Sequence, residues 1–316
     1  MRWEKGNMPL QFKQEKEINL KKTVSLGSCF SRNIYRWLQH NNVVDANNCW
    51  DIFYNPFSIL SEFKRVFEGV NWEEAVIIED RGHLKRYIDP WRTWICKDNI
   101  TELSDANKEL DNKALIRLKE SETIIITYGL AEVWRKKADR NIYLNNLPPQ
   151  VIVQNSNSME YESLFASNDE IDMVICETVD IIKKYINNDI NIILTLSPVP
   201  LKFTFSDLSV REANNISKAK LLIAIRDVCN KYDNVIYFPA YDIVQGYSEQ
   251  NYAYVWQSDN RHITACMVDF IAAKFVEFCN YNVIKSNELF SVPYVNEKGS
   301  IIGNLYTDKS YDIWEQ

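Results

Sequence analysis

The sequence contains no apolar run that approaches the ~18 residues of a membrane-spanning helix. Its opening residues, MRWEKGNMPLQFKQEKEINLKK, carry charges throughout and lack the apolar core that a signal peptide has. These two absences lead us to expect a cytoplasmic protein with no part inserted in a membrane.

Basic charge is also scarce. The chain has 36 Lys and Arg residues against 43 Asp and Glu residues, a net charge of −7 at pH 7, and no run of basic residues. Phosphates and anionic lipid headgroups bind to clustered positive charge, so we expect neither nucleic acid nor a membrane surface as a partner.

The cysteines form no recognisable framework. There are seven, an odd number, and no two of them make a C-x-x-C pair. The sequence therefore predicts neither disulfides nor a zinc site, and we expect no metal and no cofactor. We expect most of the seven to be reduced, buried, small apolar side chains; they are Cys29, Cys49, Cys96, Cys176, Cys229, Cys266 and Cys279.

Glycine and proline are few, at 8 and 9 residues, whereas 46% of the residues are hydrophobic and 25% are charged. This balance is typical of a folded globular protein rather than a disordered or fibrous one. Four short apolar runs end in turn residues and predict strands at Thr23–Leu26, 123–129, 191–200 and 234–240. The runs are continuous rather than alternating, which favours a parallel sheet buried on both faces.

Helical spacing of apolar residues fills the intervals between these strands. It predicts helices after the first strand and over 168–186, 217–232 and 263–279. Strands that alternate with helices of this length indicate βαβ units, and thus an α/β fold with a mostly parallel sheet. No linker divides the chain, so we expect one domain over residues 1–316.

Two segments depart from this alternation. The stretch from about 131 to 165 contains Pro148-Pro149 and an Asn/Ser cluster, which predicts an irregular, lid-like insertion. The tail after about residue 283 also lacks periodicity, and we expect it to be a C-terminal extension packed on the body.

Parallel sheets place active sites beyond the carboxyl ends of their strands, which directs attention to the residues that follow each strand. Among the three histidines, His262 opens a strongly apolar helical pattern and has Asp259 three residues before it. In such a D-x-x-H turn the carboxylate can accept from Nδ1–H of the ring and leave Nε2 free as a base. The alternative is that Asp259 only caps the helix that follows.

The chain carries an ordered set of motifs, LGSCFSRNI, YNPFSIL, TYGLAEVW, LTLSPVPL, ANNISKAKL, YFPAYDI and DNRH, between residues 26 and 262. This set resembles the SGNH/GDSL hydrolase superfamily, and more closely the GSCFA family within it. The resemblance implies a three-layer α/β/α sandwich of the flavodoxin-like type. It also implies a nucleophile after the first strand, with His262 as general base and Asp259 orienting the ring.

The nucleophile has two candidates. Aligned without gaps on the Gly-Asp-Ser turn of the superfamily, Gly27 matches the glycine, Ser28 the aspartate and Cys29 the attacking serine. A thiol at a helix N-terminus beside a histidine favours Cys29, because both neighbours stabilise a thiolate. Ser28 is the second candidate, and a third possibility is that neither residue reacts and both only fill a tight corner.

An oxyanion hole needs donors near the nucleophile. Gly129 is one candidate, because glycine lets the backbone turn closely after the strand at 123–129. The asparagine that the superfamily carries in its Gly-x-Asn-Asp block is absent here, so Asn55 is the candidate for a side-chain donor, against its ordinary role as a turn initiator. Glu132 is either a partner of substrate hydroxyls or the start of a helix, and Lys218 either reaches the site or is a solvated helix charge.

Function follows from the resemblance as an expectation. We expect an esterase or O-acyltransferase that forms a covalent acyl-enzyme and acts on an acylated carbohydrate or a similar small ester, with an acyl thioester as a candidate donor. The aromatic stretch YIDPWRTWI (87–95) is a candidate sugar-binding wall, although such residues are more often core. The alternative function is that of a catalytically decayed scaffold that binds carbohydrate or assembles with other proteins.

Overall fold

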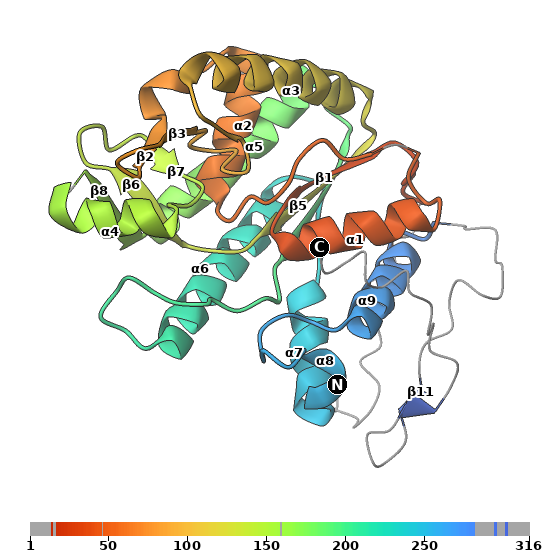
Figure 1. Cartoon of the computed structure of the whole chain (residues 1–316). Coiled ribbons are helices and arrows are strands. Elements are labelled where there is room, and N and C mark those ends of the chain that lie inside the picture. Colours follow the sequence, from red (N-terminus) through yellow and green to blue (C-terminus); the bar gives the residue numbers. More distant parts are fainter. Residues whose placement is uncertain are drawn as a thin grey trace.

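The computed structural model describes residues 14, 17–45, 47–158, 160–281, 294–295 and 301–302. Its centre is a four-stranded, fully parallel sheet in the order β1-β5-β9-β10 (Figure 1). The strands are β1 (Thr23–Gly27), β5 (Thr123–Tyr128), β9 (Asn191–Leu196) and β10 (Val235–Phe238). Each lies on one of the four apolar runs, so the predicted strands and their parallel arrangement are confirmed.

Helices cover both faces of this sheet, and the residues of its strands are largely buried. Ile124 and Ile126 pack into one core and Ile125 into the other. The first face carries α2 (Pro56–Glu68), α3 (Ile100–Glu120), α5 (Asn168–Tyr185) and α6 (Val210–Lys231). The second carries α1 (Cys29–His40), α7 (Ala240–Gln250), α8 (Tyr252–Val255) and α9 (Ala265–Phe278). The expected three-layer α/β/α sandwich is confirmed.

The sheet has a point where its winding reverses. After α1 the chain returns to make a parallel bridge between Ile52 and Gly27, on the side of β1 away from β5. The connection into this bridge runs over one face through α1, and the connection out of it runs over the other face through α2. Such a reversal opens a crevice at the carboxyl ends of the strands.

The segment at 131–165 is regular rather than irregular, so that expectation is wrong. It forms β6 (Glu132–Lys136), β7 (Tyr143–Leu144), α4 (Pro149–Ser158) and β8 (Tyr161–Phe165), with an antiparallel sheet in the order β7-β6-β8. Two-residue and half-exposed strands of this kind leave little periodicity in a sequence.

A second antiparallel sheet lies between α2 and α3. It follows η1 (Glu73–Ala75) and consists of β2 (Ile77–Asp80), β3 (Lys85–Ile88) and β4 (Cys96–Lys97). The loop after β3 includes most of the aromatic stretch at 87–95, where Trp91 and Ile95 belong to a small buried cluster. That stretch is therefore core and does not form a sugar-binding wall.

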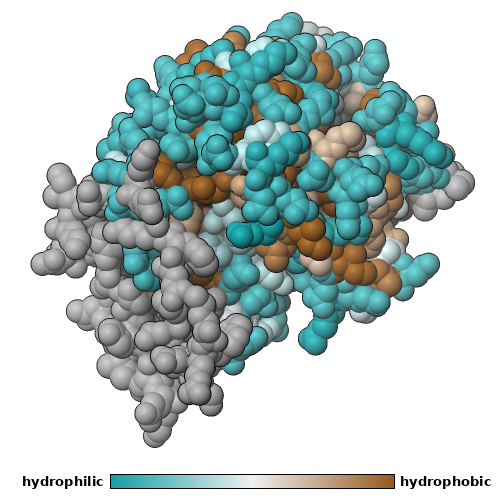
Figure 2. Space-filling model, turned by 180° about the vertical axis from the view of Figure 1, so that it is seen from behind, coloured by the Kyte–Doolittle hydropathy of each residue, from teal (hydrophilic) through white to brown (hydrophobic). Residues whose placement is uncertain are grey.

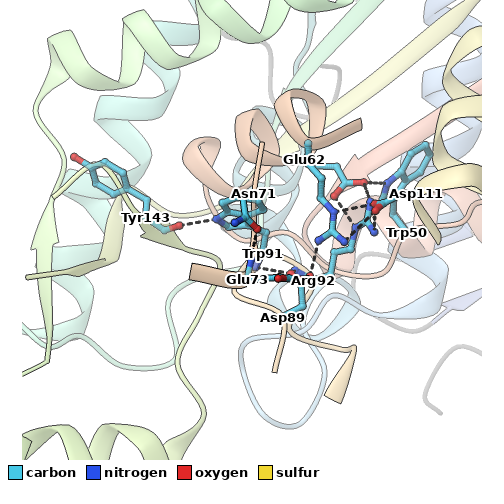
Figure 3. A network of polar contacts seen from close by, with 10 residues as sticks. Trp50, Glu62, Asn71, Glu73, Asp89, Trp91, Arg92, Asp111 and Tyr143 are labelled. Carbon is cyan, nitrogen blue, oxygen red and sulfur yellow. Dashed lines mark hydrogen bonds and ion pairs between the residues drawn. The ribbon is translucent and has the colours of Figure 1, made fainter. Parts of the chain in front are cut away.

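A network of buried charges attaches this sheet to the helices (Figure 3). Arg92 is fully buried and pairs with Glu62 of α2, with Nη2 and Oε1 2.6 Å apart, and with Asp111 of α3, with Nη1 and Oδ1 2.7 Å apart. Arg65 pairs with Asp89 and Asp111 in the same network. Buried charges are tolerated when they are paired in this way.

The expected packing of the tail after residue 283 lies outside the described residues, apart from β11 (Tyr294–Val295) and β12 (Ile301–Ile302), which pair with each other. Within the described part of the chain, none of the helices has both the length and the apolar character to cross a bilayer.

Candidate active site

A cavity of about 270 Å³ lies at the carboxyl end of the central sheet. Residues that directly follow three of the strands line it, namely Ser28 and Cys29 after β1, Gly129 after β5 and Ser197 after β9. The insertion and the loop between β9 and α6 complete its wall, and Arg261 closes another side. The crevice that the topology predicts is therefore occupied by the residues that the sequence singles out.

Gly27 makes the corner between β1 and α1 possible. Its φ of +140° is one that side-chain-bearing residues rarely adopt, and a Cβ there would lie 2.3 Å from the carbonyl oxygen of Thr127. Only glycine lets β1 approach β5 this closely and still turn into the helix. The glycine of the GSCF motif is thus required by the backbone.

Ser28 and Cys29 face different partners. Ser28 is the N-cap residue of α1 and is 5% exposed, but its hydroxyl makes no cap and donates to Oγ of Ser197 at 3.0 Å. Cys29 is the first residue of the helix, is half-buried and lies close enough to His262 to raise the pKa of the imidazole. Of the two candidates, it is Cys29 that meets the imidazole.

The ring of His262 has a defined tautomer. Nδ1 lies 2.5 Å from Oδ2 of Asp259, and Nε2 lies 2.8 Å from Nη1 of Arg261. A guanidinium can only donate, so Nε2 accepts and Nδ1 carries the proton, which it donates to Asp259. Nε2 is thus the basic nitrogen of the ring.

Asp259 does not cap α9, so the alternative interpretation of the D-x-x-H turn is wrong. The N-cap is Thr264, whose hydroxyl accepts from the backbone N–H of Met267 at 3.2 Å. Asp259 instead accepts the backbone N–H groups of Arg261 and His262 in addition to the ring N–H. Its carboxylate orients the turn and the imidazole together.

The electrostatics of the pair match its geometry. Desolvation alone raises the pKa of Asp259, but the backbone N–H groups of His262 and Arg261 and the imidazole outweigh it and lower this pKa to about 2. The interaction with Cys29, followed by the hydrogen bond with Asp259, raises the pKa of His262 above its usual 6.5, against the lowering effects of burial and Arg261. With its pKa lowered to about 2, Asp259 is ionised at neutral pH.

The two candidates for the oxyanion hole have different positions. Gly129 lines the cavity, and a Cβ there would lie 3.0 Å from the carbonyl oxygen of Tyr54 and 3.7 Å from Cβ of Ser28. Asn55 is 1% exposed and does not line the cavity. It caps α2 by accepting from Ser58 N–H at 2.9 Å and donates to the carbonyl of Leu144 at 2.9 Å, so its assignment as an oxyanion donor is wrong.

Glu132 and Lys218 are both buried, contrary to the solvated role for the lysine. Glu132 begins strand β6 rather than a helix and lines the cavity. Its carboxylate accepts from Thr204 Oγ1 at 2.8 Å and from the backbone N–H of Phe205 at 2.7 Å. Lys218 is 3% exposed and lies behind Gly129.

The far wall of the cavity is aromatic. Trp134 and Phe205 make an edge-on contact with ring centroids 4.6 Å apart, and Phe203 follows at 5.3 Å from Phe205. Phe203 and Phe205 remain 48% and 41% exposed. Figure 2 shows hydrophobic surface that interrupts the hydrophilic face and extends toward the lower right. The loop before α6 lies on this side, since it is at the lower left in the opposite view of Figure 1.

Sequence reasoning missed most of this wall. The aromatic stretch at 87–95 was the more conspicuous signal, whereas Trp134, Phe203 and Phe205 are separated in sequence and become neighbours only through β6 and the loop after β9. The only sequence signal for Ser197 is its position at the end of a predicted strand, and the only one for Arg261 is its position next to His262. Within the described residues, no cluster of three or more His, Cys, Asp or Glu side chains has a metal-binding arrangement.

The protein is thus an α/β/α sandwich in which the imidazole of His262 lies between the thiol of Cys29 and the carboxylate of Asp259, at the carboxyl edge of the sheet. The chain belongs to the GSCFA family, whose model matches residues 22–275 and so includes Cys29, Asp259 and His262. Comparison with curated proteins and with solved structures gives no match.

Proposed function

We propose that this protein is an acyl-transfer enzyme of the SGNH/GDSL type with Cys29 as its nucleophile. In the structure Nε2 of His262 accepts from Arg261, and its single lone pair cannot serve two donors. Once the guanidinium has moved away, Nε2 accepts the thiol proton as sulfur attacks the carbonyl carbon of an ester or thioester. The proton then passes to the leaving alcohol or thiol, and the acyl group remains on Cys29 as a thioester. The single observation that carries this proposal is the chain of contacts from Cys29 through His262 to Asp259 at the edge of a cavity.

The oxyanion of the tetrahedral intermediate needs hydrogen-bond donors that are already in place. We assign this role to the backbone N–H groups of Cys29 and Gly129. Cys29 is at the first position of α1, where backbone N–H groups have no partner within the helix and the helix dipole is positive.

The substrate that fits best is an acylated carbohydrate or a similarly small, partly polar ester. The cavity combines the aromatic faces of Trp134 and Phe205 with hydrogen-bonding groups from Asn146 and Ser163. A fatty chain leaves such polar groups unpaired, whereas a sugar offers both apolar C–H faces and hydroxyls. The thioester on Cys29 is a reactive acyl donor, so transfer to a sugar hydroxyl and hydrolysis are both outcomes of the same intermediate.

Kinetics of single variants test the proposal. With aryl acetates and acetyl thioesters as substrates, Cys29→Ala and His262→Ala are expected to lower kcat/KM by about 10³-fold or more, because members of such a unit act together. Ser28→Ala is the matched control, since it removes the neighbouring hydroxyl without touching the thiol, and we expect a loss below about tenfold.

Turnover that survives in Cys29→Ala but disappears in Ser28→Ala contradicts the assignment of the nucleophile. Absence of turnover in the wild type with every ester and thioester tested, together with saturable binding of a sugar, supports instead the alternative of a binding protein on a decayed scaffold.

A further inference from the structure

Lys218 occupies an unusual position for a lysine. It lies in the middle of α6 and is 3% exposed. Its ammonium group donates to the carbonyl oxygen of Gly129 at 2.9 Å and to that of Val199 at 3.0 Å. In the described part of the chain no carboxylate pairs with it, so its charge is buried against two neutral carbonyls.

These two carbonyls belong to the loops that follow β5 and β9, and both loops line the cavity. The adjacent Ser217 accepts the backbone N–H of Ala131 at 2.7 Å, while Leu130 N–H donates to the carbonyl of Tyr54 at 2.8 Å. Consecutive residues of α6 therefore fix the turn that begins at Gly129. A lysine is not needed for this alone, because a neutral amide could bind two carbonyls without a buried charge.

The charge of Lys218 lies directly behind the cavity wall, because its ammonium group binds the carbonyl of Gly129, and Gly129 and the proposed nucleophile Cys29 both line the cavity. Two titratable or charged groups act electrostatically on the Lys218 ammonium group. They are Cys29 from α1 and Arg261 from the turn before α9. Burial lowers the pKa of Lys218 to about 7, negative charge on Cys29 raises it, and Arg261 lowers it further. A buried cation is unfavourable unless negative charge compensates it, and of these two neighbours only Cys29 can carry negative charge.

We propose that Lys218 is a positioning residue with two tasks: it holds the two loops that line the cavity after β5 and β9, and it balances negative charge that develops on Cys29. The inference rests on the proposed role of Cys29 as nucleophile. It adds a buried cation to the Cys29, His262 and Asp259 arrangement.

Alkylation of Cys29 by iodoacetamide over pH 5 to 10, followed by peptide mass spectrometry, tests the charge without any substrate. Lys218→Met removes charge and donors, whereas Lys218→Gln keeps donors for the carbonyls and removes only the charge. Both are expected to slow labelling of Cys29 at neutral pH by about threefold or more and to move its pH profile upward. Lys220→Met is the matched control and leaves the profile unchanged, because this half-buried lysine two residues along the same helix donates to Asn168 and to neither cavity loop.

The reverse measurement covers the case in which Lys218 variants fail to fold. NMR of the wild-type chain labelled with ¹³C at the lysine ε-carbons follows the titration of Lys218 directly. In Cys29→Ala the midpoint is expected to fall, because the anion that favours the ammonium form is gone and the coupling of two sites is reciprocal. An unchanged midpoint, or a labelling profile in Lys218→Gln that overlays the wild type, overturns the inference. Neither readout requires ester turnover, so the inference and the proposed function can fail separately.

Discussion

His262 has three polar neighbours, and their balance determines the pH range in which it can act as a base. Asp259 and Cys29 raise its pKa, while Arg261 lowers it through like charge. The imidazole accepts a proton only when it is neutral, so we expect the proposed activity to be lost as the pH falls through this raised pKa. The acid limb of its pH profile is then expected above the 6.5 of an ordinary histidine.

Arg261 provides the test of this balance. In Arg261→Met the like charge is removed, so the pKa of His262 rises further and the acid limb of log(kcat/KM) moves to higher pH. Arg211→Met, on the exposed start of α6, is the control and leaves the limb in place. A limb that stays at the wild-type position in Arg261→Met, or moves to lower pH, contradicts the account of His262.

Single residues also mark the limit of what the sequence could reveal. Asp259 and His262 were predictable because three residues of spacing suffice to join a carboxylate to Nδ1. Asn55 was assigned wrongly because Asn-Pro starts a helix and a turn alike, and only the fold decides which way the amide points. Lys218 was undetectable as a buried charge, because a lysine on a helix is ordinarily solvated.

At the scale of elements, the corner between β1 and α1 places the thiol. Gly27 allows β1 to approach β5, and the helix then begins at once with Cys29 at its first position. Any shift of β1 away from β5 moves the thiol relative to the turn of His262, which is anchored separately at the start of α9. Strand packing and catalytic geometry are therefore coupled at this corner.

Gly27→Ala is expected to lower the free energy of unfolding by at least about 2 kcal/mol, because it combines backbone strain with a contact between Cβ and a backbone carbonyl. It also lowers kcat/KM, since β1 has to move. Gly82→Ala is the matched control: its φ is +79°, but a Cβ there meets nothing within 4 Å, so only strain of about 1 kcal/mol remains. Chemical denaturation of the three proteins checks the order, and equal losses in both variants contradict the packing argument.

Buried strands could be predicted from the sequence more readily than short or exposed ones. The four central strands are largely buried and rich in apolar residues, so composition and the turn residues after them located each one. The strands of the insertion at 131–165 are short or half-exposed, and their pairing is fixed by contacts with one another, such as Trp134 opposite Leu144 and Ser163. The order of strands in the sheet depends in the same way on contacts between distant segments.

At the scale of the whole molecule, the buried charges of Figure 3 join segments that are distant in sequence. Arg92 from the loop after β3 pairs with Glu62 on α2 and Asp111 on α3, and Glu62 also accepts from Nε1 of Trp50 at 2.8 Å. The network therefore fixes α2, which begins two residues after Tyr54 in the cavity wall.

Removal of one charge from this network is expected to destabilise the protein strongly. Glu62→Gln leaves the guanidinium of Arg92 buried without its main counter-charge, and we expect a loss of about 3–5 kcal/mol in the free energy of unfolding. Glu109→Gln breaks an exposed pair with Lys113 and serves as the control, with an unchanged melting temperature. A Glu62→Gln protein as stable as the wild type shows that the network does not hold the fold.

The central claim is that a covalent acyl group forms on Cys29. Rapid acid quench of the enzyme with an acetyl thioester, followed by peptide mass spectrometry, locates that group directly. We expect an acetylated Cys29 peptide that accumulates in His262→Ala more slowly than in the wild type and never forms in Cys29→Ala. An acetyl group found on Ser28, or on no residue while ester is consumed, contradicts it.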